Sequence, residues 1–111
     1  MIYMSVDDFY EKVSLLSGMS RIEEIECAKQ MRKGDVGARE RLIQSYLPMV
    51  AGHIEHIKPQ MQNLGLVLYC VQALEQAVDS FDFLQESESF SHRLSWHLRQ
   101  AVTKYIVRWQ M

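Results

Sequence analysis

The sequence predicts a small all-α protein, a bundle of four to five helices. Apolar residues recur at helical spacing along most of the chain, and no stretch keeps up the alternation of apolar and polar residues that is typical of strands. The 111 residues, 48% hydrophobic and 23% charged, fit one globular domain with a modest core. A layered helical bundle is the architecture that such a pattern favours.

Two helices are expected near the N-terminus. Residues 6–16 form a short amphipathic segment with Phe9, Val13 and Leu16 on one side. The next helix is expected to begin at Ser20, because a serine followed three residues later by glutamate, here Glu23, can form a capping box. Its core face would hold Ile22, Ile25, Ala28 and Met31. We therefore divide the chain into an N-terminal helical extension, residues 1–19, and a helical domain, residues 20–111.

Three further helices follow. Gly34 ends the second helix and Asp35 can cap the third, in which Pro48 predicts a kink or a restart. The loop expected at residues 58–65 leads into a fourth helix. The loop expected at residues 84–89 leads into a fifth, capped by Ser89 or Ser91. The expected core faces are Leu42, Tyr46, Val50 and Ile54, then Leu66, Val67, Cys70, Val71, Leu74, Val78 and Phe81, then Leu94, Leu98, Val102, Tyr105 and Trp109.

Charge is unevenly distributed along the chain. The net charge is −2, yet residues 90–111 carry four basic side chains and no acidic one. The other eight basic residues stand against all 14 acidic residues. A basic element on an acidic body can meet a polyanion locally even when the whole molecule is acidic.

The last helix gathers its basic and polar side chains on one side. At about 100° per residue, they fall on a stripe away from the core face, with Trp96 and Thr103 beside it. Solvated charge explains such a stripe equally well. If Trp96 is exposed, it can stack on an unpaired base while the cations hold phosphates; otherwise it is buried beneath residues 84–89 or an N-terminal helix. The stripe consists of Arg93, His97, Gln100, Lys104 and Arg108.

A second surface lies on the outer face of the fourth helix. Leu68 and Tyr69 lie opposite its core face, beside Gln72. Sizeable apolar groups on a solvent-facing side indicate a protein contact, self-association, or cover from the N-terminal helices. The sequence leaves these three interpretations open.

Catalytic and metal-binding patterns are absent from the sequence. The four histidines do not form a ligand pattern, and neither a glycine-rich phosphate loop nor a nucleophile elbow occurs. We expect no enzyme, no cofactor and no metal. Cys27 and Cys70 lack metal-ligand spacing and are expected to be reduced. No apolar stretch is long enough for a membrane span, and Asp7 and Asp8 argue against a signal peptide, so a cytoplasmic protein is expected.

Two segments carry a family resemblance. The first comprises residues 26–35 and 38–50, where a helix ends at Gly-Asp and a long helix follows. The second comprises residues 74–82, 90–91 and 96–106, with the runs Ala-Val-Asp-Ser-Phe-Asp and Arg-Gln-Ala-Val-Thr. In order and spacing these segments resemble region 2 of bacterial RNA polymerase sigma factors of the housekeeping type. The resemblance extends from about residue 20 to residue 108, nearly the whole chain.

The resemblance implies two binding activities. The fourth helix would bind the clamp coiled coil of the RNA polymerase core. The final helix and the loop before it would capture the promoter −10 element as a single strand. Flipping a base from a duplex costs a few kcal/mol, which stacking and phosphate contacts can offset. The positions that match DNA-facing residues of the family are Phe90, Trp96, Gln100, Thr103 and Lys104.

The chain also departs from the family pattern. Arg93 stands where the family has the aromatic that stacks on the flipped adenine, and His97 replaces the second of two adjacent tryptophans. The loop at residues 84–89 is acidic where the family is basic. On the fourth helix, apolar or small residues replace the expected polar clamp-binding residues: Gly65, Leu68, Tyr69 and Val71.

Two functions remain after these departures. One is a sigma factor-like transcription initiation protein that acts through promoter DNA and RNA polymerase, with the −35-binding domain supplied by a second polypeptide. The other is a protein-interaction module on the same scaffold, binding a regulator or a second copy of itself, without promoter binding. The basic stripe favours the first function; Leu68, Tyr69 and the acidic loop favour the second.

Overall fold

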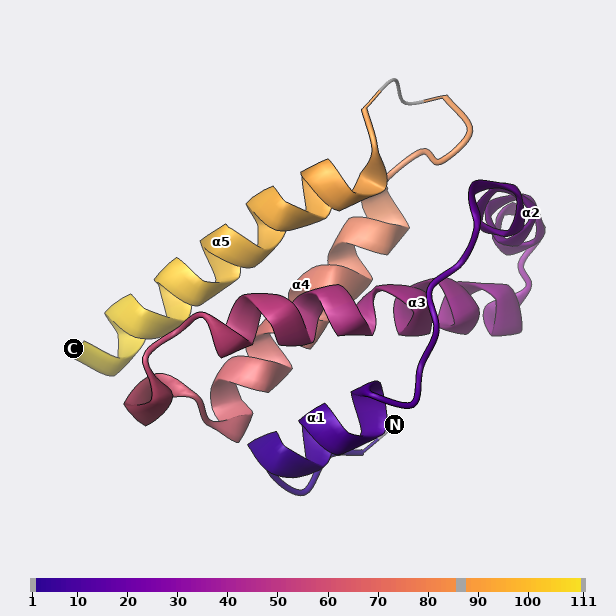
Figure 1. Cartoon of the computed structure of the whole chain (residues 1–111). Helices are drawn as coiled ribbons and strands as arrows, with labels where there is room; N and C mark the ends of the chain where they lie inside the picture. Colours follow the sequence, from indigo (N-terminus) through magenta and orange to yellow (C-terminus); the bar gives the residue numbers. More distant parts are fainter. Residues whose placement is uncertain (1, 86–87, 111) are drawn as a thin grey trace.

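The computed structural model describes residues 2–85 and 88–110, with only the backbone described for residues 109 and 110. This part of the chain forms five α-helices, one short 3-10 helix (η1) and no strand, which confirms the predicted all-α bundle of four to five helices. The elements shown in Figure 1 are α1 (Val6–Val13), α2 (Arg21–Arg32), α3 (Val36–Glu55), η1 (Pro59–Met61), α4 (Leu64–Ser80) and α5 (Phe90–Gln110).

The long helices α3, α4 and α5 form the body of the molecule. α5 runs back along α4 in the opposite direction, and α3 crosses them (Figure 1). α2 packs on α3, whereas α1 packs on α3 and α4 at the far side from α5. The antiparallel α4–α5 pair therefore leaves one long side of α5 uncovered by the other helices.

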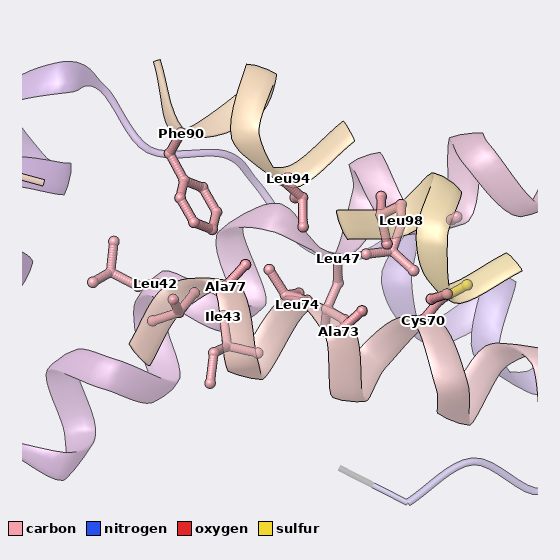
Figure 2. Close-up of a cluster of buried hydrophobic side chains, with 14 of the residues drawn as sticks. Leu42, Ile43, Leu47, Cys70, Ala73, Leu74, Ala77, Phe90, Leu94 and Leu98 are labelled. Atoms are coloured by element: carbon pink, nitrogen blue, oxygen red, sulfur yellow. The ribbon is translucent and has the colours of Figure 1, made fainter. Parts of the chain in front are cut away.

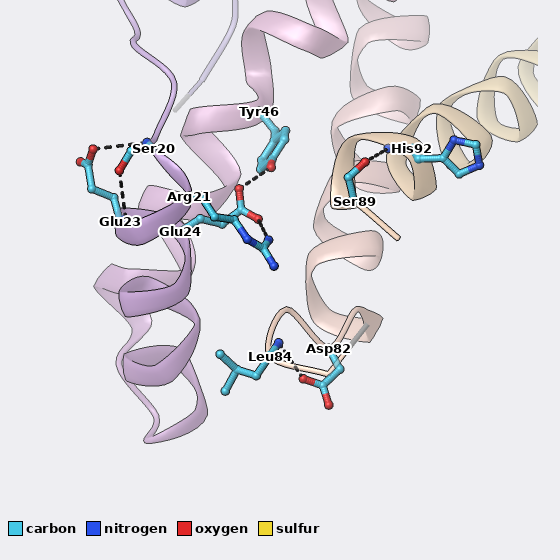
Figure 3. Close-up of polar contacts among 9 residues, drawn as sticks. All are labelled: Ser20, Arg21, Glu23, Glu24, Tyr46, Asp82, Leu84, Ser89 and His92. Carbon is cyan, nitrogen blue, oxygen red and sulfur yellow. Dashed lines mark hydrogen bonds and ion pairs between the residues drawn. The ribbon is translucent and has the colours of Figure 1, made fainter. Parts of the chain in front are cut away.

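Side-chain caps determine where the helices begin. Ser20 and Glu23 form the predicted capping box, shown in Figure 3, and the Asp35 carboxylate accepts a hydrogen bond from the Ala38 amide at 3.1 Å, the predicted cap of α3. Gly34 has φ 93°, the left-handed conformation that glycine adopts without strain, and it ends α2 as expected. At α5, Ser89 accepts a hydrogen bond from the His92 amide (Figure 3).

The hydrophobic core lies where α3, α4 and α5 meet (Figure 2). Cys70 is fully buried there, and its burial raises the pKa of the thiol to about 12. Cys27 is also buried, and both cysteines are free thiols. The core residues labelled in Figure 2 are Leu42, Ile43 and Leu47 from α3, Cys70, Ala73, Leu74 and Ala77 from α4, and Phe90, Leu94 and Leu98 from α5.

The first helix contributes to the same core. Phe9 and Val13 are buried, and the ring of Tyr3 meets Phe9 edge-on with ring centroids 4.9 Å apart. The Tyr10 hydroxyl donates a hydrogen bond to Gln62 Oε1 at 2.8 Å, which ties α1 to the connection between α3 and α4. The helix ends at Val13, three residues earlier than predicted.

The sequence-based face of α2 was wrong at its start. Ile22 is 76% exposed, whereas Glu24 is buried. The Glu24 carboxylate accepts hydrogen bonds from the Tyr46 hydroxyl at 2.6 Å and from Arg21 at 3.2 Å (Figure 3). Burial and this hydrogen bond raise the pKa of Tyr46 far above its ordinary value. Since a buried carboxylate needs such partners, the Tyr46 contact determines which face of α2 points inward.

The second departure concerns Pro48. Of the kink or restart expected there, the restart does not occur: α3 continues through Pro48 as one helix of 20 residues. Leu47 and Val50 on either side are buried. Packing of this segment against the core offsets the backbone hydrogen bond that a proline cannot make.

A hydrogen bond joins the start of α4 to the last part of α5, at a position where a glycine leaves room for it. The Tyr105 hydroxyl donates to Asn63 Oδ1 at 2.6 Å, and the same oxygen caps α4 by accepting from the Leu66 amide at 3.0 Å. A Cβ atom on Gly65 would lie 2.7 Å from the Tyr105 hydroxyl oxygen. A glycine at this position is therefore required by the close approach of Tyr105.

We predict that Gly65→Ala lowers the free energy of unfolding by about 1–3 kcal/mol, because the new methyl group displaces the Tyr105 hydroxyl from its hydrogen bond. Urea denaturation measures this change. Gly52→Ala is the matched control: no atom lies within 4 Å of a Cβ at this position in α3. It should stabilise the protein by about 0.5–1 kcal/mol through helix propensity. Equal effects of the two substitutions would contradict the proposed clash.

Candidate nucleic-acid interface

The packing of α5 on α4 determines which side chains of α5 face outward. Leu94, Leu98, Ala101 and Tyr105 are buried, and they recur at helical spacing along one face. Gln100, Thr103, Lys104 and Arg108 lie outside this face and are exposed. The predicted stripe is therefore open to solvent along most of its length.

Trp96 is not buried by a loop or by an N-terminal helix. Its side chain is 51% exposed, and the ring meets the His97 ring edge-on with centroids 5.2 Å apart. The ring also lines two surface hollows, one on each side of it. An indole in this position has ring surface available to a ligand, and the helix backbone holds the side chain in place.

One of these hollows is a groove between α4 and α5 with a volume of about 410 Å³. Tyr69 and Gln72 line it from α4; Trp96, Gln100 and Lys104 line it from α5. Residues predicted for nucleic-acid binding and residues predicted for partner binding thus share one groove. Helical periodicity alone had predicted two separate surfaces, one on α5 and one on α4.

The second hollow lies near the start of α5 and has a volume of about 510 Å³. Arg93 and His97 line it together with Trp96, Ser80 and Glu88. Arg93 Nε donates to Glu88 Oε1 at 2.7 Å. Arg93 is therefore held by an acidic neighbour, unlike a cation that points freely into solvent.

Nearer the C-terminal end of α5, side chains of α4 and α5 contact each other directly. Arg108 donates to the Tyr69 hydroxyl at 2.8 Å, and the Tyr69 and Tyr105 rings meet edge-on with centroids 5.2 Å apart. Tyr69 is consequently half-buried against α5. By contrast, Leu68 is 53% exposed and Gln72 is exposed on the outer face of α4.

Phe90 does not lie on this interface. It is 1% exposed, and its ring packs edge-on against Phe81 and Tyr46, with centroids 5.2 Å and 4.7 Å apart, and against Phe83. A ring enclosed by three others has no face available to a base. The assignment of Phe90 to DNA contact is therefore corrected: it is a core residue that anchors the first turn of α5.

Several basic side chains outside α5 form ion pairs with acidic side chains. Arg39 on α3 makes a two-pronged contact with Asp79 on α4, at 2.7 Å and 2.9 Å, and this contact lowers the pKa of Asp79. Arg32 on α2 lies 2.7 Å from Asp82. Pairing of this kind weakens the positive potential around α2 and α3, so the acid-free sequence of α5 dominates the basic character of the surface.

Two further residues belong to the hollows. Gln76 lines the α4–α5 groove, and Ser80 lines the hollow at Arg93. Gln72, Gln76 and Ser80 follow one another at intervals of four residues, which places all three on one stripe of α4. This periodicity is the signal from which they could have been predicted. No group of three or more His, Cys, Asp or Glu side chains within the described part of the chain is arranged to hold a metal ion.

Comparison with known proteins places this geometry in context. No family model matches the chain. The chain is 29% identical over 108 residues to the RNA polymerase sigma factor SigA of Clostridium acetobutylicum, and 29% identical over 99 residues to that of Listeria monocytogenes. These alignments cover 93% and 88% of this chain but only 28% and 26% of the two relatives.

The chain is similar to a sigma factor fragment, and divergent from it. It spans about a quarter of the length of each relative. None of the helices described in residues 2–85 and 88–110 has the length and apolar character needed to cross a bilayer.

Two histidines near α5 give the fold a dependence on pH. Burial, and then the charge of Arg93, lower the pKa of His97. Burial, Arg99 and His56 lower the pKa of His53. Both imidazoles are therefore more easily protonated in the unfolded chain than in the folded protein.

We predict that the free energy of unfolding falls as the pH drops from about 7.5 to about 5.5, because the unfolded chain takes up protons first as the pH passes its histidine pKa of about 6.5. The loss ends once the pH is below the folded-state pKa values. Urea denaturation of the wild type and of the variant His53→Gln/His97→Gln measures it. The double variant should lose less stability over this range; an unchanged pH dependence would contradict the assignment.

Proposed function

We propose that the chain is a sigma factor-like transcription initiation protein that binds the promoter −10 region as a single strand and binds the RNA polymerase core. The observation that carries the proposal is the half-exposed Trp96 ring in the N-terminal half of an acid-free helix, where it lines two hollows. The similarity to RNA polymerase sigma factors over most of the chain supports the same function.

The interface offers the two contacts that single-stranded DNA requires. A base can stack on the Trp96 ring, a contact worth about 1–3 kcal/mol. Lys104 lies eight residues after Trp96, and Arg108 lies four residues after Lys104. These steps correspond to about 12 Å and about 6 Å along the helix axis. A strand lying along α5 can therefore place a base at Trp96 and phosphates at the two cations. Gln100 lies between Trp96 and Lys104, and its side-chain amide can hydrogen-bond to a base edge.

Binding of the polymerase core would use the outer face of α4. Leu68 and Gln72 are exposed there, next to the groove that holds Trp96. A partner helix, such as one of a clamp coiled coil, could pack its apolar face on Leu68. Core and DNA would then bind to adjacent faces of the α4–α5 pair.

The second candidate is a protein-interaction module on the same scaffold, which binds a regulator or a second copy of this chain and has lost promoter binding. Two observations favour it. Leu68 on α4 and Val107 on α5 are both large apolar side chains exposed to solvent. In addition, Arg93 and Arg108 are engaged by Glu88 and Tyr69.

We predict that single-stranded −10-like oligonucleotides quench Trp96 fluorescence at low salt. The experiment uses the Trp109→Phe variant, in which Trp96 is the remaining tryptophan. Lys104→Glu in this background should weaken binding at least several-fold, since it replaces a phosphate contact by a repulsion. Fluorescence titration at several salt concentrations measures both effects.

The matched control is Lys58→Glu, which makes the same charge change at an exposed residue between α3 and η1. It should have a much smaller effect than Lys104→Glu. Absence of quenching at low salt, or equal effects of the two substitutions, would contradict promoter binding through α5.

The second candidate predicts a different result. If the exposed apolar residues form a self-association surface, sedimentation analysis will show mass increasing with protein concentration, and Leu68→Glu will abolish the increase. Ile22→Glu adds the same charge at an exposed apolar residue on α2 and should leave association unchanged. A monomer at all concentrations would exclude self-association.

A further inference from the structure

Glu88 and Arg93 form an ion pair at the start of α5, within the candidate interface. Both the Nε atom and a terminal nitrogen of the guanidinium contact the same carboxylate oxygen, Oε1. The other oxygen, Oε2, lies 3.8 Å from the His92 ring nitrogen Nε2. One carboxylate thus lies between two basic side chains.

This contact is inside a hollow that is otherwise suited to an anion. The hollow of about 510 Å³ is lined by Ser80, Glu88, His92, Arg93, Trp96 and His97. Apart from Glu88, these residues supply a guanidinium, two imidazoles, a hydroxyl and an indole. Glu88 is the single acidic group among them.

A guanidinium binds carboxylate and phosphate oxygens with the same planar array of donors. Arg93 is also packed 5.8 Å from the centroid of the Phe81 ring, which restricts where its donors can point. The Glu88 carboxylate therefore occupies the position at which a phosphate would meet Arg93. Because Trp96 lines the same hollow, a nucleotide whose base stacks on the indole would bring its phosphate to this position.

We propose that this hollow is a phosphate-binding subsite for a nucleic-acid strand, and that Glu88 is a built-in competitor for it. The proposal rests on the proposed DNA-binding function. Glu88 neutralises Arg93 and adds a negative charge beside Trp96, so the intact protein binds DNA more weakly than its α5 sequence implies. Any contact that draws Glu88 away from Arg93 strengthens binding.

The test compares wild type with Glu88→Gln and Glu11→Gln, using anisotropy of a labelled single-stranded −10-like oligonucleotide at low salt. Glu11→Gln is the matched control, because it removes the same charge from an exposed residue of α1, on the far side of the bundle (Figure 1). Glu88→Gln should bind roughly three- to tenfold tighter than wild type, as expected for release of a partly exposed ion pair together with loss of a repulsion. Glu11→Gln should change affinity less than about twofold.

Two further measurements identify Arg93 as the group released. In an Arg93→Gln background, Glu88→Gln should keep only the smaller gain that comes from loss of the repulsion. The Arg93 Nε–Hε resonance in nitrogen-edited NMR should shift in Glu88→Gln, and should shift in wild type when the oligonucleotide is added. A full gain of affinity in the Arg93→Gln background, or an Arg93 resonance identical in wild type and Glu88→Gln, would overturn the proposal.

The outcomes also separate this proposal from the proposed function. If wild type binds the oligonucleotide and Glu88→Gln binds no tighter than Glu11→Gln, the competitor role is overturned while promoter binding stands. If neither wild type nor Glu88→Gln binds at low salt, both are overturned. Tighter binding by Glu88→Gln that is mostly lost in the Arg93→Gln background supports both.

Discussion

The rotation of α5 about its own axis is the constraint on which the interface depends. It is fixed at both ends: Phe90 is enclosed by aromatic rings at the first turn, and the Tyr105 hydroxyl is bound to the capping oxygen of Asn63 near the last. Between these anchors Leu94 and Leu98 face α4. A helix turned by one residue, about 100°, would bury different side chains. The exposure of Trp96 and Lys104 therefore follows from contacts made elsewhere along the helix.

Much of this arrangement could be predicted from the sequence, because it depends on local periodicity. The core face of α5 and the exposed stripe at Gln100 and Lys104 follow from a repeat of 3.6 residues. The caps at Ser20 and Asp35 were predictable because they are also local: a cap needs only a side chain and an amide three residues later. Periodicity identifies the apolar face of a helix, and α4 and α5 each have one apolar face.

The remaining features depend on pairs of residues distant in the sequence. Glu24 points inward towards the Tyr46 hydroxyl, 22 residues later, on the same face of α2 as the buried Cys27 and Ala28, and Ile22 faces solvent. Tyr69 lies under Arg108, 39 residues away, which no local pattern reveals. Phe90 was assigned to DNA contact by position in a family pattern, and its burial follows from rings on α3 and beyond the end of α4. A motif identifies a position in the chain, but the direction of a side chain depends on its neighbours.

The burial of both thiols has a practical consequence for labelling. Cys27 and Cys70 are enclosed in the folded protein, and the raised pKa of Cys70 keeps its sulfur protonated at neutral pH. Alkylating reagents attack the thiolate, so they can modify Cys70 only when the bundle opens. A cysteine introduced on the surface can then carry a spectroscopic label without removal of the native pair. The slow background reaction of Cys70 would itself record how often α3, α4 and α5 separate.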